Sequence, residues 1–174
     1  MELDPLSPNY SAWLGHVYNL KGQSDLAIAQ LGRAIELDPS LWRPHWLIAI
    51  AYANAARFGD AIAEAQKACE LTGRSAPTLG ILGMVYGRAG RPDEARAVLE
   101  QLTTRARTTS VPPFAMAVAY MGLGELDRAL DWLEMGAEER DVLVVSIVKS
   151  DPLLVPLHGH PRYRALLRKM NLEA

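Results

Sequence analysis

The chain is poor in features that mark a secreted, membrane-bound or nucleic-acid-binding protein. It has one cysteine, Cys69, among 174 residues, so no internal disulfide can form. The longest apolar run, 142–148, is interrupted by Ser146 and is too short to cross a bilayer, and no signal peptide is recognisable. Eighteen Lys and Arg against twenty Asp and Glu leave a formal net charge of −2, which offers no attraction to nucleic acid or anionic lipid. We therefore expect a soluble, cytoplasmic chain that binds neither nucleic acid nor membrane.

Residues that carry chemistry are also too scattered to form a site. His158 and His160 stand two residues apart in a proline-flanked loop, but a firm metal site needs further ligands, and His16 and His45 belong to distant parts of the chain. Cys69 falls on an apolar helical stripe, where a cysteine behaves as a small hydrophobe. No Ser/His/Asp, Cys/His or carboxylate pair is brought together by the repeat described next. We predict no catalytic residue, no metal and no cofactor; an enzyme with an unfamiliar site is the least favoured alternative.

The sequence is organised around residues 82–99, which predict two helices joined by a tight turn. Leu82 and Tyr86 recur at helical spacing, and Gly83 leaves room for a second helix to approach. Gly90 ends the first helix, and Pro92 suits the first turn of the next. The pattern is therefore helix, turn, helix.

The same pattern recurs at intervals of 34 residues. Its markers are a tyrosine, a small residue at the turn and an alanine in the second helix. They are Tyr18, Tyr52, Tyr86 and Tyr120; Gly22, Ala56, Gly90 and Gly124; and Ala27, Ala61, Ala95 and Ala129. This period and residue order resemble the tetratricopeptide repeat. The resemblance implies an all-α fold, an α-α superhelix of about four helix pairs.

The 34-residue period also divides the chain. Four units span 8–41, 42–75, 76–109 and 110–143, with the repeat pattern clear over 8–140. Glu2-Leu3-Asp4-Pro5 recurs as Glu36-Leu37-Asp38-Pro39, so residues 1–7 are interpreted as the tail of a preceding, truncated repeat, with a chance match of a short tetrapeptide as the alternative. Residues 141–174 depart from the period and are predicted to form a helical C-terminal cap.

Within this C-terminal region, the β-branched run 142–148 has strand propensity but no partner strand, and we predict a buried helix. His160 is expected to cap a helix that starts at Pro161. The third return helix is expected to fray over 103–109, which is poor in helix formers.

The C-terminal motifs sharpen the resemblance. They are Trp132-Leu133-Glu134, Glu138-Glu139-Arg140-Asp141, Asp151-Pro152 and His160-Pro161-Arg162-Tyr163. They look like the C-terminal end of bacterial regulators in which such repeats follow a winged-helix transcription-activating domain, a serine/threonine kinase or an adenylate cyclase. The resemblance implies a signalling or transcription-regulation role for a larger protein, whose effector domain is not in this sequence.

The superhelix geometry of the family implies that the first helix of each pair lines a concave groove. The predicted partner-binding residues are Asn9, His16, Asn19, Arg43, Trp46, Ile50, Asn54, Met84, Arg88, Phe114, Val118 and Met121. This lining is mostly apolar and suits an amphipathic helix or a hydrophobic peptide. The positions at which some relatives clamp a C-terminal carboxylate are Ala12, His16, Ile50 and Ile81 here, so that clamp is not expected.

We therefore predict a non-catalytic protein–protein interaction scaffold that binds a protein or peptide ligand in this groove. Homodimerisation and a purely structural spacer are the alternatives. For Trp46 and Met84, packing between adjacent first helices competes directly with a role in the groove.

Overall fold

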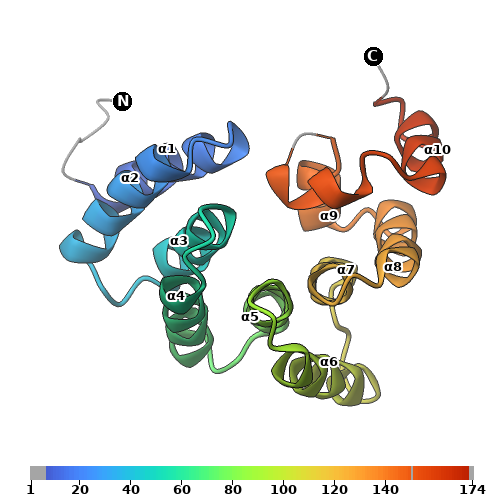
Figure 1. Cartoon of the computed structure of the whole chain (residues 1–174), viewed down its shortest axis with the longest axis horizontal. Coiled ribbons are helices and arrows are strands. Elements are labelled where there is room, and N and C mark those ends of the chain that lie inside the picture. The colour runs from blue at the N-terminus through green and yellow to red at the C-terminus, as the bar shows by residue number, and fades with distance from the viewer. Residues whose placement is uncertain (1–6, 150, 173–174) are drawn as a thin grey trace.

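The computed structural model describes residues 7–149 and 151–172, and in these the chain is helical without strands. Four antiparallel helix pairs follow one another along an arc (Figure 1). They are α1 (Pro8–Leu20) with α2 (Ser24–Leu37), α3 (Trp42–Asn54) with α4 (Phe58–Leu71), α5 (Ala76–Arg88) with α6 (Pro92–Ala106), and α7 (Pro113–Gly122) with α8 (Leu126–Glu138). The all-α superhelix predicted from the repeat is confirmed. No helix in the described ranges has the length and apolar character needed to cross a membrane.

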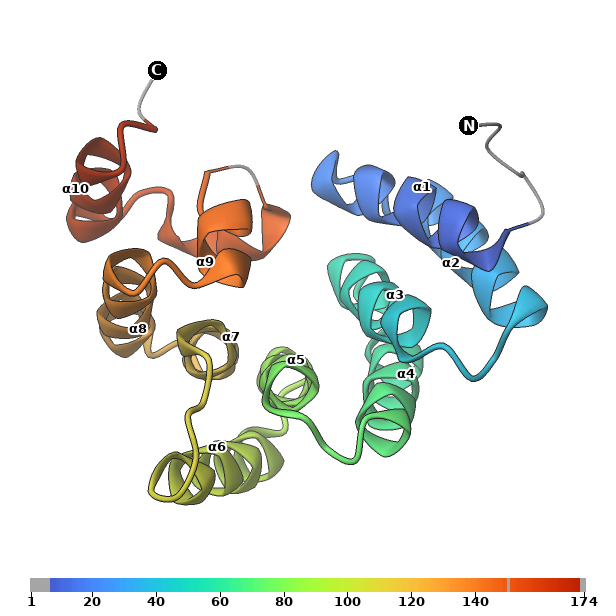
Figure 2. The same ribbon diagram turned by 180° about the vertical axis from the view of Figure 1, so that it is seen from behind.

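The first helix of each pair lies on the inside of the arc and the second on the outside, as Figures 1 and 2 show from opposite sides. The outer helices are amphipathic and bury one stripe of mostly small residues against the inner helices. The buried positions at the first step of that stripe are Ala27, Ala61, Ala95 and Ala129, each with almost no exposed surface. These are the repeat alanines of the sequence, so the 34-residue period is a packing period.

Each of the four turns within a pair is closed in the same way. Gly22, Gly90 and Gly124 have φ values of 67°, 73° and 75°, in the left-handed region that favours glycine. The amide that follows each of them donates to the carbonyl oxygen of the repeat tyrosine, as from Arg91 to Tyr86 at 2.9 Å. In the second repeat the left-handed position is held by Ala56, with φ 56°.

The approach of α5 to α7 is unusually close because glycines line both helices. A Cβ at Gly87 would lie 2.1 Å from the carbonyl oxygen of Gly122, and one at Gly122 would lie 2.4 Å from the Cα of Met84. At Gly80 an added Cβ would lie 2.7 Å from the carbonyl oxygen of Ala115. A side chain at any of these three positions would push the helices apart.

The C-terminal region comprises α9 (Val142–Ile147), the 3₁₀-helix η1 (Pro152–Leu157) and α10 (Pro161–Lys169). It follows the last pair, with α9 beside α7 and α10 beside α8, and it also covers part of the inner side of the arc (Figure 1). In Figure 1, α9 lies opposite α1 on the inside of the arc. Asp141 fixes the start of α9: its carboxylate accepts from the amides of Leu143 and Val144 and from that of Phe114, at the start of α7.

Two local expectations are corrected. The run 142–148 is helical through Ile147, but Val142 is 80% exposed and Val145 45%, because only one face of this short helix packs on the core. The third return helix does not fray at 103: α6 continues to Ala106, since burial of Leu102 outweighs the weak helix propensity of the threonines. Residues 1–6, and with them the tetrapeptide interpreted as an earlier repeat, lie outside the described residues.

The last helix, α10, is held to α8 by charge as well as by apolar contact. Arg162 contacts Asp131 at 2.7 Å and Glu134 at 2.9 Å, and these carboxylates raise its pKa; Lys169 contacts Glu138 at 2.7 Å. His160 accepts from the amide of Arg162, so the predicted cap is confirmed. The pairs are half-exposed, so together they orient α10 more than they stabilise it.

The left-handed residue in the second turn yields a prediction. Replacing Ala56 by Gly should stabilise the protein by about 1 kcal/mol, because glycine adopts this φ without the steric cost that a Cβ carries. Denaturant unfolding measures the change. Ala55→Gly is the matched control: with φ −83°, Ala55 has no strain to relieve, and its replacement should destabilise. Equal losses in both variants would contradict strain at position 56.

Candidate partner-binding site

The twelve residues predicted to line the groove do lie on α1, α3, α5 and α7, but most of them are not accessible. Seven are buried, with at most 9% of their surface exposed. The buried ones are Asn19, Trp46, Ile50, Met84, Phe114, Val118 and Met121. The other five keep some surface; they are Asn9, His16, Arg43, Asn54 and Arg88. Their role in binding a partner stays a prediction.

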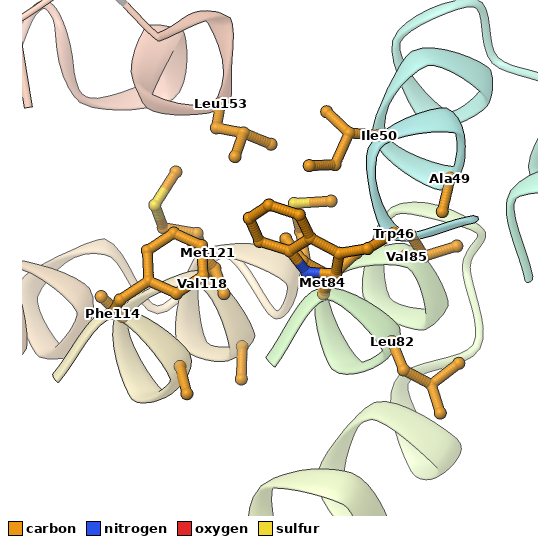
Figure 3. Close-up of a cluster of buried hydrophobic side chains, with 14 of the residues drawn as sticks. Trp46, Ala49, Ile50, Leu82, Met84, Val85, Phe114, Val118, Met121 and Leu153 are labelled. Carbon is orange, nitrogen blue, oxygen red and sulfur yellow. The ribbon is translucent and has the colours of Figure 1, made fainter. Parts of the chain in front are cut away.

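The buried members form an apolar cluster around Trp46. Its ring contacts the ring of Phe114 edge-on at 6.1 Å between centroids, and Figure 3 shows Met84, Met121 and Leu153 around the pair. Trp46 belongs to α3 and Phe114 to α7, so the contact passes over the intervening α5. Trp46 and Met84 are therefore core residues in this structure. They pack between inner helices, which is the alternative to a role in the groove.

The C-terminal region covers this cluster from the open side of the arc. Leu153 is 5% exposed, and Leu154 and Leu157 have no exposed surface. Figure 3 shows Leu153 facing Ile50 and Trp46 from η1. Burial of three leucines contributes about 1.5–3 kcal/mol each, so η1 is an integral part of the inner surface. The chain thus places its own apolar segment where a partner peptide was expected.

A cavity of about 320 Å³ remains open at one end of this covered region. The inner helices contribute Asn54, Met84, Arg88 and Met121 to its lining, and η1 contributes Pro152, Leu153, Val155 and Pro156. Arg88 donates to the side-chain oxygen of Asn54 and to the carbonyl oxygen of Ala53, both at 2.9 Å. No carboxylate of the described residues pairs with it. The guanidinium is therefore positioned at the rim with donors to spare.

At the other end of the inner helices, Arg43 lies over the ring of Trp13, 5.2 Å from its centroid. Trp13 is 59% exposed. His16 packs beside it, with ring centroids 6.0 Å apart. Burial, with a smaller contribution from Arg43, lowers the pKa of His16, which favours the neutral imidazole.

Sequence reasoning missed the residues of η1 that line the open cavity. The signal was present in the apolar stretch 152–157, which was assigned only to a cap. Neither the 34-residue period nor helix propensity predicts where this stretch packs, because its local sequence does not indicate which part of the protein it contacts.

The two histidines considered for metal binding have other roles. His158 stacks on Tyr163 at 5.7 Å between ring centroids, and His160 caps α10. Within the ranges that the structure describes, no group of three or more His, Cys, Asp or Glu side chains is arranged to hold a metal ion.

Asp151 is the buried acid of this region, and its pKa can be tested. It is 8% exposed, and its carboxylate accepts from the amide of Leu153 at 2.9 Å, at the start of η1. Burial raises its pKa, and the hydrogen bond only partly offsets this. Because the folded pKa exceeds the unfolded value, the stability that Asp151 contributes is present below the unfolded pKa and is lost as pH rises through the folded pKa.

We therefore expect Asp151→Asn to be more stable than the wild type at pH 7, with the difference shrinking toward pH 3, because Asn stays neutral and still accepts from Leu153. Thermal unfolding across pH measures this. The control, Asp151→Ala, loses the cap and should cost about 1 kcal/mol at low pH. A constant offset between the Asn variant and the wild type at all pH values would refute the burial effect.

Comparison with known proteins bears on these repeats. A family model described as TPR repeat matches residues 15–55, and one described as tetratricopeptide repeat matches residues 76–101 and 114–135. The chain is also similar to anaphase-promoting complex subunit 3 of Schizosaccharomyces pombe, with 24% identity over 174 residues. All of this chain is aligned there, but it spans only 26% of that protein.

Proposed function

Because the chain contains tetratricopeptide repeats, we propose that it is a non-catalytic scaffold that binds a peptide of a partner protein on the inner side of its arc. Such repeats generally mediate protein–protein interaction, and the similar fission-yeast protein is by its name a subunit of a complex. The C-terminal motifs support a place in a larger regulatory protein, of the bacterial kind that they resemble.

The observation that carries the proposal is the open cavity beside Arg88. Its walls are mainly apolar and include Met84 and Met121 of the inner helices and the two prolines of η1. Methionine side chains adapt to differently shaped apolar ligands. A cavity of about 320 Å³ accommodates one large apolar side chain of a partner.

The polar rim of the cavity indicates a second feature of the partner peptide, an acidic residue. Arg88 is fixed by Asn54 and Ala53 but has no carboxylate partner among the described side chains. A partner carboxylate would form a charge-assisted hydrogen bond with it. The proposed ligand is thus a peptide segment with a large apolar residue next to an acidic one, docked across α3, α5 and η1.

Peptide display against the whole chain tests this prediction. Selected peptides should carry an acidic residue beside a large apolar one, and Arg88→Gln should weaken their binding about tenfold, as loss of a charge-assisted hydrogen bond does. Arg57→Gln is the control: Arg57 lies in the turn that follows α3, directly before α4, and it lies over Tyr52 and pairs with Asp60.

Backbone NMR shifts locate the bound peptide. Perturbations at Asn54, Met84, Arg88 and Val155 support the proposal. Peptides that instead perturb only α2, α4 and α6, or that bind the Arg88 variant as well as the wild type, would refute it.

A second candidate function, self-association, is favoured by the outer surface of α1. Trp13 is 59% exposed and Val17 39%. The positions 34, 68 and 102 residues after Trp13 are Leu47, Ile81 and Ala115, and none of them is more than 2% exposed. Each of those lies on an inner helix that packs on the pair before it, whereas Trp13 keeps most of its surface among the described residues. We infer that two copies of the chain pack through α1.

Sedimentation equilibrium tests the self-association. The wild type should form dimers at concentrations of the order of 10 µM, and Trp13→Glu should remain monomeric, because a carboxylate cannot be buried unpaired in the interface. Met135→Glu is the control, since Met135 is 41% exposed on α8, away from α1. A monomeric wild type, or dimers that persist in the Trp13 variant, would exclude this interface.

A further inference from the structure

A second, smaller cavity lies deeper in the molecule, where the two ends of the arc come together. It measures about 100 Å³ and is enclosed by α1, α3, the start of α7 and the C-terminal region. Its polar lining residues are His16, Asn19, Arg43, Trp46, Ser146 and Asp151. A neighbouring space of about 40 Å³, lined by Asn9 and Trp13 among others, shares His16 and Arg43 with it and leads toward the surface of α1.

Three of the lining residues carry a buried polar atom that finds no hydrogen-bond partner among the described residues. These atoms are Nδ1 of His16, Oδ1 of Asn19 and Nε1 of Trp46. Asn19 is 6% exposed and Trp46 9%, so bulk water does not satisfy them. Buried polar groups are nearly always paired, and three exceptions on residues that line one cavity point to an occupant.

The identities of these atoms restrict the occupant. The Asn19 amide nitrogen donates to the carbonyl oxygen of Leu47 at 2.9 Å, so its free oxygen is an acceptor that needs a donor. The guanidinium of Arg43, which also lines the cavity, is a donor only, and it needs an acceptor. The occupant must therefore both accept and donate.

The charges around the cavity further restrict the chemical class of the ligand. Arg43 stands at the mouth with its guanidinium over Trp13, and no carboxylate of the described residues pairs with it. Burial lowers the pKa of His16, and Arg43 lowers it further, which disfavours a second positive charge at the cavity. On the C-terminal side, the cavity is lined by the carboxyl group of Asp151. One cationic group at the mouth favours a ligand with a single carboxylate.

We propose that this cavity binds a small carboxylic acid with a hydrogen-bond donor on the neighbouring carbon, an α-amino or α-hydroxy acid. The carboxylate pairs with Arg43, and the amino or hydroxyl group donates to Asn19. The two neighbouring spaces measure about 140 Å³ together, which is room for about four or five non-hydrogen atoms at roughly 30 Å³ each, so part of the carboxylate of a six-atom acid lies in the mouth. This site does not depend on the proposed peptide-binding function, because it uses the opposite end of the inner surface.

Titration of the whole chain with L-alanine, L-lactate and propionate tests the proposal, with the Trp46 indole N–H signal in nitrogen-edited NMR as the readout. The three acids share a carbon skeleton and differ only in the donor. We expect a saturable shift with alanine or lactate at about 1 mM and binding of propionate at least tenfold weaker. If alanine is the better ligand, Asp151→Asn should weaken the binding of alanine and leave the binding of lactate unchanged. This comparison distinguishes a site for amino acids from a site for hydroxy acids.

Arg43→Gln should weaken the binding of the better ligand about tenfold, because it removes the positive charge that pairs with the ligand's carboxylate. Arg43 is exposed, so this variant keeps the fold, and its melting temperature confirms that. Arg96→Gln is the control, as Arg96 pairs with Asp93 on the outer helix α6. Absence of a saturable shift with both acids would mean that the cavity holds only water. Equal binding of propionate, or unchanged binding by the Arg43 variant, would equally overturn the proposal.

Discussion

The close approach of α5 and α7 determines the shape of the inner surface. It requires bare backbone at Gly80, Gly87 and Gly122, where a Cβ would lie between 2.1 and 2.7 Å from atoms of the facing helix. Because α7 packs so closely on α5, Phe114 of α7 contacts Trp46 of α3. The centroids of the two rings are 6.1 Å apart. Contact between two inner helices that are not neighbours in the arc narrows the groove at its centre.

The narrowed groove explains why the C-terminal region lies where it does. Trp46, Phe114 and Met121 would leave a large apolar patch exposed on the inside of the arc, and η1 covers it from the open side with Leu153. The short helix α9 and the charged contacts between α10 and α8 hold η1 in place. What remains open is divided between two ends, one rimmed by Arg88 and the other by Arg43.

The two ends suit different ligands for physical reasons. The cavity beside Arg88 is larger and mainly apolar, so it gains most from burying a side chain. The cavity near Arg43 is small and carries unpaired polar atoms, so it gains most from hydrogen bonds. A scaffold with both would bind a protein partner at one end and a small acid at the other.

The sequence by itself determined the repeat architecture. The tyrosines, turn glycines and helix alanines recur every 34 residues because each helix pair makes the same local contacts with the next, so their pattern is readable without any long-range information. The same logic placed the predicted groove residues on the inner helices. Tertiary structure alone decided which of them stay accessible, because that depends on contacts such as Trp46 with Phe114 and Ile50 with Leu153, between residues that no period relates. The position of the C-terminal helices was likewise decided by the apolar surface that they cover. That surface exists only when the helix pairs are assembled, so no single repeat predicts it.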